Sequence, residues 1–283
     1  MNSFGFKFPV QERKTALYNL EEDWYLPLLS KLRGVPMQSI KRSNFGQYSM
    51  AVNYLTSVLE EASAINKVAV YNIDHMAQLL FSGADVVALL NRALTGNFTE
   101  MKVGQCKYTL LLNEQGGVQD DMILMRVTET SFILVINAGH DITDTIEVEG
   151  VKKEYIADID RIMACKKDGE EVWAKDISDT LLKIDVQGPL AFKLLKEVYG
   201  ENVLKNRYNP EKNMNFFTFN QFERNGQHYY LSRTGYTNRW GWELYIPVAV
   251  AEEDAKIIIS KALDFGGLLV GLGGRDENRI SAG

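Results

Sequence analysis

The chain has 283 residues, a formal net charge of −6 and an isoelectric point near 5.3. At about 100–200 residues per domain, this length predicts one large globular domain or two closely packed ones. The negative charge removes the broad electrostatic attraction to nucleic acid and to anionic membranes, so we expect neither as a partner. Two cysteines far apart in the sequence fit a reducing compartment, and no stretch has the pattern of a leader or a membrane span. We therefore expect a soluble, cytoplasmic protein.

Hydrophobic periodicity predicts a series of helices and strands along the chain. Apolar residues at spacings of three and four predict an amphipathic helix over 49–66, which leads into a strand over 67–73. The further expected elements are a helix over 83–94, a hairpin over 108–127, a strand from 131, a helix near 155–164, a strand, turn and helix over 181–200, a hairpin over 215–233 and a helix over 251–265. No tandem repeat, low-complexity linker or clean domain boundary interrupts this series.

The hairpin over 108–127 carries two acidic residues directly after its Gly-Gly turn. In an extended strand the side chains alternate, so Asp121 shares a face with Ile123 and Met125, and Asp120 shares the other face with Met122. Asp121 is therefore expected on the more apolar side. A carboxylate that faces an apolar interior needs a partner or a chemical task, because its unpaired burial costs several kcal/mol. The alternative interpretation is a pair of turn residues that bind backbone amides.

Polar residues also follow two other predicted strands. Asn137 and His140 come where the apolar strand from 131 ends, a position at which sites are commonly built. From this segment alone, a turn residue is the favoured interpretation of Asn137. Asp74 and His75 follow the strand over 67–73. No further ligand accompanies them, so this histidine is interpreted as a hydrogen-bonded structural residue and not as a metal ligand.

A second polar constellation lies in the last fifth of the chain. The segment 232–246 has a loop with Tyr236, followed by a strand that contains Glu243, and a rigid aromatic beside a carboxylate suits a flat heteroaromatic ligand. The alternative interpretation is a β-hairpin with an exposed tyrosine and a solvent-facing glutamate. Farther on, Arg275 follows a glycine-rich segment and is expected at the start of a helix. There its guanidinium group could bind a carboxylate through two N–H groups. These glycines match neither a dinucleotide fingerprint nor a P-loop.

Four separated motifs together resemble those of the aminomethyltransferase (glycine cleavage system T-protein) family of folate-dependent one-carbon transferases. They are Asn-Ile-Asp-His-Met at 72–76, Asn-Glu-Gln-Gly-Gly-Val-Gln-Asp-Asp at 113–121, Ser-Arg-Thr-Gly-Tyr-Thr with the following Gly-Trp-Glu-Leu over 232–244, and Gly-Leu-Gly-Gly-Arg-Asp at 271–276. The resemblance implies an α+β fold of intertwined subdomains around a central folate channel. It also implies that residues 1–283 are the folate-binding catalytic region, and that the family's carboxy-terminal barrel is missing from this chain.

The resemblance also implies roles for single residues. Asp121 matches the family's acidic residue beside the reacting folate nitrogens and the substrate amine, and is the expected catalytic residue. Met76 and Asn137 match positions of the pterin pocket. The remaining expected contacts to tetrahydrofolate, the implied cofactor, are Tyr236, Glu243 and Arg275. No metal site is expected.

The implied reaction takes an aminomethyl group from a lipoylated carrier protein and yields 5,10-methylenetetrahydrofolate and ammonia, as part of glycine cleavage. Departures from the family pattern at 72–76 and 237–241, and a Phe-Phe pair at 216–217, lie on the expected substrate side. They leave two alternatives open. One is a folate-dependent demethylase that takes a small S-, N- or O-methylated donor, for which an aromatic wall beside a carboxylate is suitable. The other is a non-catalytic folate-binding protein.

Overall fold

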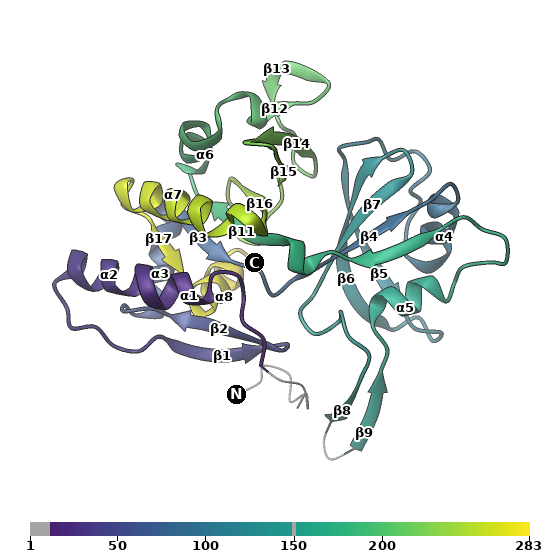
Figure 1. Ribbon diagram of the computed structural model, residues 1–283, viewed down its shortest axis with the longest axis horizontal. Coiled ribbons are helices and arrows are strands. Elements are labelled where there is room, and N and C mark those ends of the chain that lie inside the picture. Colours follow the sequence, from purple (N-terminus) through teal and green to yellow (C-terminus); the bar gives the residue numbers. More distant parts are fainter. Residues whose placement is uncertain (1–11, 149–150) are drawn as a thin grey trace. The chain divides into compact units, whose positions relative to one another are not determined.

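The computed structural model describes residues 12–148 and 151–283. These residues form two compact units that are built from interleaved segments of the chain (Figure 1). The first unit contains Phe45–Gln47 and His75–Asp179, and the second contains Glu12–Asn44, Tyr48–Asp74 and Thr180–Gly283. The amino terminus, on which the argument about a leader partly rests, lies outside the described residues.

The first unit is built on a five-stranded antiparallel sheet with the strand order β10-β4-β7-β6-β5. Its strands, drawn in blue and teal in Figure 1, are β4 (Ala77–Ser82), β5 (Cys106–Leu112), β6 (Val118–Thr128), β7 (Ser131–Ile136) and β10 (Trp173–Asp176). Two helices, α4 (Val86–Ala93) and α5 (Asp158–Met163), and a separate hairpin of β8 (Asp144–Val148) and β9 (Val151–Tyr155) complete the unit.

The core of the first unit lies between the two helices and one face of this sheet. Alternate residues of β6, such as Met122 and Leu124, point to this face and pack with Leu89 of α4 and Ile162 of α5. Helix α4 buries Val86, Leu89 and Leu90, the spacing that brings apolar residues onto one side of a helix. The sequence argument therefore found α4 and α5 correctly.

The second unit is built on a six-stranded sheet with the strand order β14-β15-β16-β11-β3-β17. All neighbouring pairs are antiparallel except β17 and β3, which run parallel. The strands are β3 (Ala69–Asn72), β11 (Leu181–Gln187), β14 (Phe219–Arg224), β15 (Gln227–Ser232), β16 (Gly241–Pro247) and β17 (Leu268–Val270). Strand β11 is buried along its whole length.

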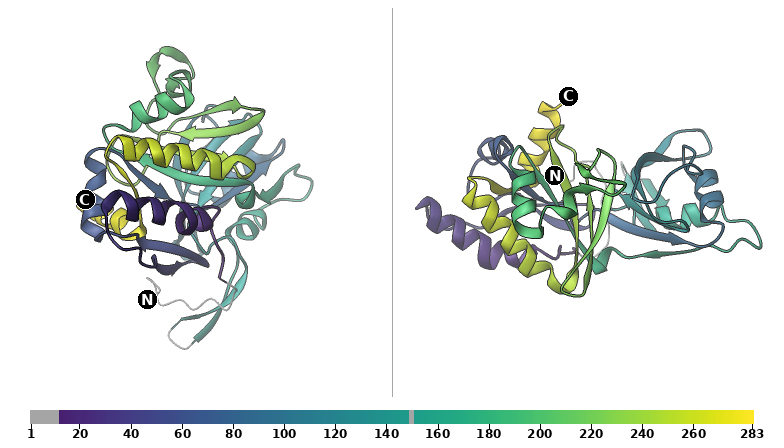
Figure 2. Two further views of the ribbon diagram at one scale, coloured as in Figure 1. Left: turned by 60° about the vertical axis from the view of Figure 1, so that its left-hand side comes forward. Right: turned by 90° about the horizontal axis from the view of Figure 1, so that it is seen from above.

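Helices and two small sheets surround the six strands, as the views in Figure 2 show. The longer helices, of eight or more residues, are α2 (Leu26–Arg33), α6 (Ala191–Tyr199), α7 (Ala251–Asp264) and α8 (Leu272–Ser281). The shorter helical pieces are α1 (Tyr18–Leu20), η1 (Glu21–Tyr25), α3 (Val58–Ser63), η2 (Ala64–Asn66), η4 (Asn202–Leu204) and η5 (Val248–Val250). A further piece, η3 (Ser178–Thr180), lies where the chain passes from the first unit to the second. The small sheets pair β1 (Lys41–Phe45) with β2 (Tyr48–Asn53) and β12 (Lys205–Asn206) with β13 (Asn209–Asn213).

Two expectations about these elements are wrong. The helix predicted over 49–66 is a strand, β2, followed by the short helix α3, because residues 48–53 pair with β1. Phe216, expected in the core, is 62 % exposed, whereas Phe219 of the same hairpin is fully buried. The mixed α+β class is confirmed. Within the described residues, no helix has both the length and the apolar character needed to cross a membrane.

Candidate functional site

The pleat of β6 sends its two acidic residues to opposite faces of the sheet in the first unit. Asp120 lies on the core face with Met122 and is only 4 % exposed, while Asp121 is exposed on the other face. The expectation that Asp121 points to the more apolar side is therefore wrong. Both faces of β6 are apolar farther along the strand, so composition did not show that the helices cover the face of Asp120.

Asn137, which follows β7, bonds to both carboxyl groups. Its backbone N–H donates to Oδ2 of Asp120 at 3.1 Å, and its side-chain Nδ2 donates to Oδ1 of Asp120 at 2.7 Å. The same Nδ2 lies 3.0 Å from Oδ1 of Asp121. The other oxygen of Asp121 accepts a hydrogen bond from the hydroxyl of Tyr108 at 3.2 Å. The structure thus brings two of the predicted site residues, Asp121 and Asn137, into direct contact.

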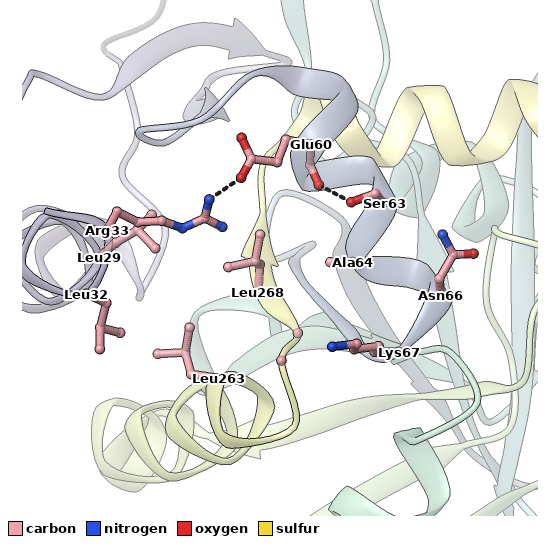
Figure 3. A pocket seen from close by; sticks show the side chains of 12 residues that line it. Leu29, Leu32, Arg33, Glu60, Ser63, Ala64, Asn66, Lys67, Leu263 and Leu268 are labelled. Carbon is pink, nitrogen blue, oxygen red and sulfur yellow. Dashed lines mark hydrogen bonds and ion pairs between the residues drawn. The ribbon is translucent and has the colours of Figure 1, made fainter. Parts of the chain in front are cut away.

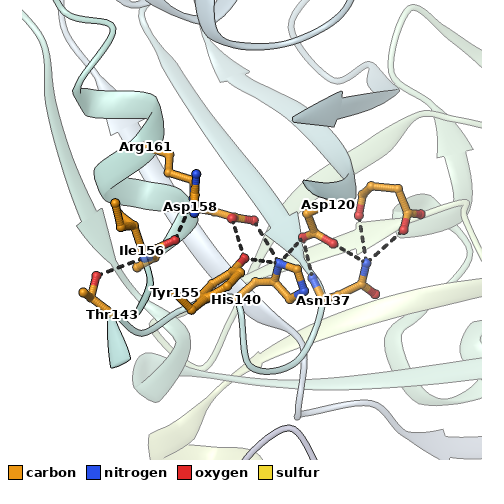
Figure 4. Close-up of polar contacts among 10 residues, drawn as sticks. Asp120, Asn137, His140, Thr143, Tyr155, Ile156, Asp158 and Arg161 are labelled. Atoms are coloured by element: carbon orange, nitrogen blue, oxygen red, sulfur yellow. Dashed lines mark hydrogen bonds and ion pairs between the residues drawn. The ribbon is translucent and has the colours of Figure 1, made fainter. Parts of the chain in front are cut away.

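A group of polar residues continues from Asp120 toward the start of α5 (Figure 4). Nδ1 of His140 lies 3.8 Å from Oδ2 of Asp120 and 3.6 Å from Oδ2 of Asp158. The hydroxyl of Tyr155 is 2.5 Å from Nδ1 of His140 and donates to Oδ1 of Asp158 at 3.0 Å. The sequence argument noticed His140 at the end of its strand but missed Tyr155 and Asp158.

Burial and charge shift the protonation of this group. Burial raises the pKa of Asp120 to about 6, although the charge of His140 and the hydrogen bonds from Asn137 act in the opposite direction. For His140, burial disfavours the charged form, but the carboxylates of Asp158 and Asp120 outweigh it and raise the pKa of the imidazole above 6.5. The two acids therefore stabilise the imidazolium form of His140 relative to the neutral ring.

Asp120, His140 and Asp158 are also close enough to be considered as metal ligands, since one ligand atom from each lies within 4.8 Å of the others. The Tyr155 hydroxyl, however, already lies against Nδ1, the ring nitrogen that faces the two carboxylates. These contacts fit a hydrogen-bonded histidine between two acids and require no ion.

Met76, the remaining predicted residue in this unit, precedes β4. Its carbonyl oxygen accepts a hydrogen bond from the side chain of Gln78. The preceding His75 is buried, and its ring packs edge-on against Phe45 with 5.0 Å between the centroids. These residues lie in the first unit, as Asp121 does.

In the second unit, Glu243 of β16 lies opposite Asp185 of β11 and is buried instead of facing solvent. Its Oε1 pairs with Nζ of Lys183 at 3.0 Å, and its Oε2 accepts a hydrogen bond from Thr234. Burial works against ionisation, but Lys183 and Thr234 more than offset it and lower the pKa of Glu243. This carboxyl group is therefore an anion inside the unit.

Tyr236 and Arg275 meet on the same unit. The guanidinium carbon of Arg275, at the start of α8, lies 5.3 Å from the centroid of the Tyr236 ring, and the ring itself is 53 % exposed. Nε of Arg275 is buried and has no hydrogen-bond partner among the described residues. The charge of Arg275 also stabilises the anion of Glu243. The three residues predicted from the last fifth of the chain therefore belong to one unit and are electrostatically connected.

Two charged residues of β11 were missed by the sequence argument. Lys183 and Asp185 alternate with Ile184 and Val186 in the run Leu-Leu-Lys-Ile-Asp-Val-Gln, and both are almost completely buried. The run is part of a strand that the sequence predicted correctly. The alternation of its two charged residues with apolar ones was the signal that could have placed both charges on one face of the strand. Asp185 accepts a hydrogen bond from Gln187, while its Oδ2 has no partner among the described residues.

A separate cleft of about 390 Å³ lies elsewhere on the second unit (Figure 3). Leucines of α2 and α7, such as Leu29 and Leu263, line it together with Lys67 and the ion pair of Arg33 with Glu60. None of the six predicted site residues lines this cleft. The polar clusters around Asp121 and around Glu243 are therefore the better candidates for a functional site.

The described residues thus form a mixed α+β fold that carries two clusters of polar residues. The family model of the GCVT N-terminal domain matches residues 38–283. The chain belongs to this family. It is 30 % identical over 243 residues to the aminomethyltransferase of Exiguobacterium sibiricum, covering 86 % of this chain and 59 % of that protein. It is likewise 30 % identical over 241 residues to the aminomethyltransferase of Thermus thermophilus, covering 85 % of this chain and 61 % of that protein.

A solved structure shares the fold. The glycine cleavage system aminomethyltransferase T from Bartonella henselae matches 95 % of this chain and 62 % of its own chain, with a TM-score of 0.73 and 25 % identity. The chain thus spans about three fifths of the length of the relatives that it matches. The comparisons confirm the resemblance on which the sequence argument rested.

Proposed function

We propose that this chain is the folate-binding region of a tetrahydrofolate-dependent aminomethyltransferase. In this reaction the aminomethyl group of a lipoylated carrier yields 5,10-methylenetetrahydrofolate and ammonia. The observation that carries the proposal is the exposed carboxyl group of Asp121, which Asn137 and Tyr108 hold in place within a family domain. A relative that is named an aminomethyltransferase supports the same chemistry.

Asp121 would act on the reacting nitrogens. An anchored carboxylate can accept a hydrogen bond from a nitrogen nucleophile, take up its proton and stabilise a neighbouring cation such as an iminium. Asn137 uses its Nδ2 to hold one oxygen of Asp121, and Tyr108 holds the other. Each carboxylate oxygen has a second lone pair, so both remain able to accept a further hydrogen bond from substrate.

Tetrahydrofolate, when bound, supplies the nitrogens that accept the one-carbon unit. The second unit offers groups that fit such a molecule: the exposed ring of Tyr236 for stacking, the anion of Glu243 for ring N–H groups, and Arg275 for a carboxylate. The unpartnered Nε of Arg275 is a donor that still needs an acceptor. These features support Tyr236, Glu243 and Arg275 as folate-binding residues. For Met76 and Asn137 the same role is proposed from the family resemblance alone.

The demethylase alternative receives less support from the structure. The aromatic residue in the departure at 237–241 is Trp240. The guanidinium carbon of Arg233 lies 4.5 Å from the centroid of that ring, so Arg233 would compete with a methylated cation for it. Asn72 and Asp74, which depart from the family pattern at 72–76, form hydrogen bonds to other residues of the chain. Asn72 donates to Glu21 at 2.8 Å, and Asp74 accepts from the backbone of Ala16 at 2.8 Å.

The test compares Asp121→Asn with the unchanged chain, each supplied with tetrahydrofolate and an aminomethylated lipoyl carrier. We expect methylenetetrahydrofolate formation to fall by about 10²-fold or more, the usual contribution of a positioned acid or base, while folate affinity changes little. Asp168→Asn, at an exposed turn, is the matched control and should keep the activity. No methylenetetrahydrofolate from the unchanged chain, under conditions in which a full-length relative is active, would refute the proposal.

A further inference from the structure

His140 lies within ion-pair distance of two buried acids, Asp120 and Asp158. The residue Asp158 is fully buried and Asp120 is 4 % exposed, and an unpaired carboxylate in such a place costs several kcal/mol. Among the residues that the structure describes, His140 is the one basic side chain that forms an ion pair with either of them. The other charged or titratable groups that face this cluster are Asp121 on β6, Asp141 beside the histidine, Tyr155 on β9 and Arg161 on α5. Arg161 lies 5.5 Å from the ring centroid of Tyr155.

The hydrogen bonds determine which ring nitrogen of His140 carries a proton. The hydroxyl of Tyr155 has one proton and donates it to Oδ1 of Asp158. Its oxygen therefore accepts from Nδ1 of His140, 2.5 Å away. A proton on Nδ1 points toward the side of the ring on which both carboxylates lie. Asp158 and Tyr155 thus hold the imidazole in the orientation that serves Asp120.

Asp120 in turn fixes Asn137 through two hydrogen bonds, one to each of its oxygens. Ionised Asp120 can accept both bonds. A proton on one oxygen makes that oxygen a donor facing an N–H group, so one of the two bonds is lost. If the lost bond is the one to Nδ2, the Asn137 amide is held only by Asp121 itself, through its backbone oxygen and its Oδ1, each at 3.0 Å, and its orientation is less firmly fixed.

We propose that His140 is a positioning residue for Asp121: as an imidazolium held by Asp158 and Tyr155, it keeps Asp120 ionised, and ionised Asp120 fixes the Asn137 amide that orients Asp121. The path runs through Asp120 and Asn137, so His140 itself touches no substrate. The consequence for catalysis rests on the proposed function, whereas the consequence for protonation does not.

The protonation of Asp120 is measured without any turnover, from the side-chain amide signals of Asn137 in the full chain by NMR. These signals should change with a midpoint near pH 6 in the unchanged chain, because the pKa of Asp120 is about 6. His140→Asn removes the cation, and we expect the midpoint to rise by about one pH unit, the usual size of a charge effect at this distance. Asp158→Asn should lower the titration midpoint of the His140 ring in the same samples.

The matched control is Glu223→Gln. It removes a carboxyl group 3.3 Å from a histidine, His228, on the exposed surface of the other unit, and it should leave the Asn137 signals unchanged. In the enzyme assay, His140→Asn should move the acid limb of the pH profile of kcat upward by the same one unit. When Asp120→Asn is already present, adding His140→Asn should cause no further shift of this acid limb.

An unchanged Asn137 midpoint in His140→Asn would overturn the proposal even if the chain is an active transferase. A stoichiometric divalent metal in the purified protein that disappears with His140→Asn would also overturn it, because the metal would then be the neutralising cation. Absence of turnover together with the expected NMR shifts would refute the proposed function, but it would establish that His140 keeps Asp120 ionised and that Asp120 fixes Asn137.

Discussion

Asp185, in the middle of the sheet of the second unit, connects pH to stability. Burial and the nearby negative charge of Glu243 raise its pKa from 3.8 to about 7. A raised carboxyl pKa means that the folded chain holds the proton more tightly than the unfolded chain. The stabilisation is therefore complete below the ordinary value of 3.8 and is lost as the pH rises through about 7.

We expect Asp185→Asn to flatten this pH dependence. Through this one group, the unchanged chain should lose on the order of 2 kcal/mol of unfolding free energy between about pH 5 and about pH 8. The asparagine does not titrate, so the variant should lose less over the same interval. Chemical unfolding at both pH values measures the difference. Asp264→Asn, at an exposed carboxyl at the end of α7, is the control, and an equal slope in all three proteins would contradict the prediction.

Single residues also mark where sequence reasoning reached its limit. The family resemblance pointed to Asp121 and Asn137, and a hydrogen bond joins them in the structure. Pleat alternation placed the two acids on opposite faces correctly, but the burial of each depends on where α4 and α5 pack, which the strand does not encode. Asp158 was invisible for a similar reason, because its partner His140 lies 18 positions earlier in the chain.

At the scale of elements, the glycine-rich start of α8 permits a close backbone contact with β2. A Cβ built on Gly271 would lie 2.3 Å from the carbonyl oxygen of Val52 in β2. The backbone N–H of Gly271 also donates to Glu61 of α3 at 2.9 Å. The sequence expectation that these glycines allow close approach is confirmed. This contact joins α8 to the segment that precedes the first unit.

Gly271→Ala should destabilise the second unit by about 3 kcal/mol, the upper part of the range for overpacking, because backbone atoms of β2 would have to move. Gly226→Ala is the matched control. It places a side chain at φ +73° in a turn with no atom within 4 Å, so it pays only the backbone penalty of about 1 kcal/mol. Urea unfolding of both variants gives the comparison. Equal costs would show that α8 can shift away from β2.

The missed strand β2 shows why local pattern was insufficient for this element. Its apolar residues also fit a helical spacing, and only the pairing with β1 decides the outcome. A local signal for the true start of α3 did exist. The side chain of Ser57 accepts a hydrogen bond from the backbone of Glu60 at 3.2 Å, and a serine three residues before a glutamate is a common pattern for the first turn of a helix.

At the scale of the whole molecule, the two units differ in how they draw on the chain. Every strand of the five-stranded sheet comes from residues 77–176. The six-stranded sheet instead places β3, from before this range, between β11 and β17, from after it. The chain leaves the second unit just after β3 and re-enters it just before β11. Because strands stand at both crossings, the sequence showed no linker or domain boundary there.

This difference predicts which parts of the chain fold alone. Residues 75–179, expressed as a fragment, should fold cooperatively, since they contain the whole five-stranded sheet and both helices of its core. Residues 180–283 alone should not, because without β3 the buried strand β11 loses one neighbour and β17 loses its only one within the described sheet. Circular dichroism and amide spectra measure both outcomes. Adding residues 12–74 in trans should restore the sheet in the second fragment, and cooperative unfolding of 180–283 by itself would contradict the prediction.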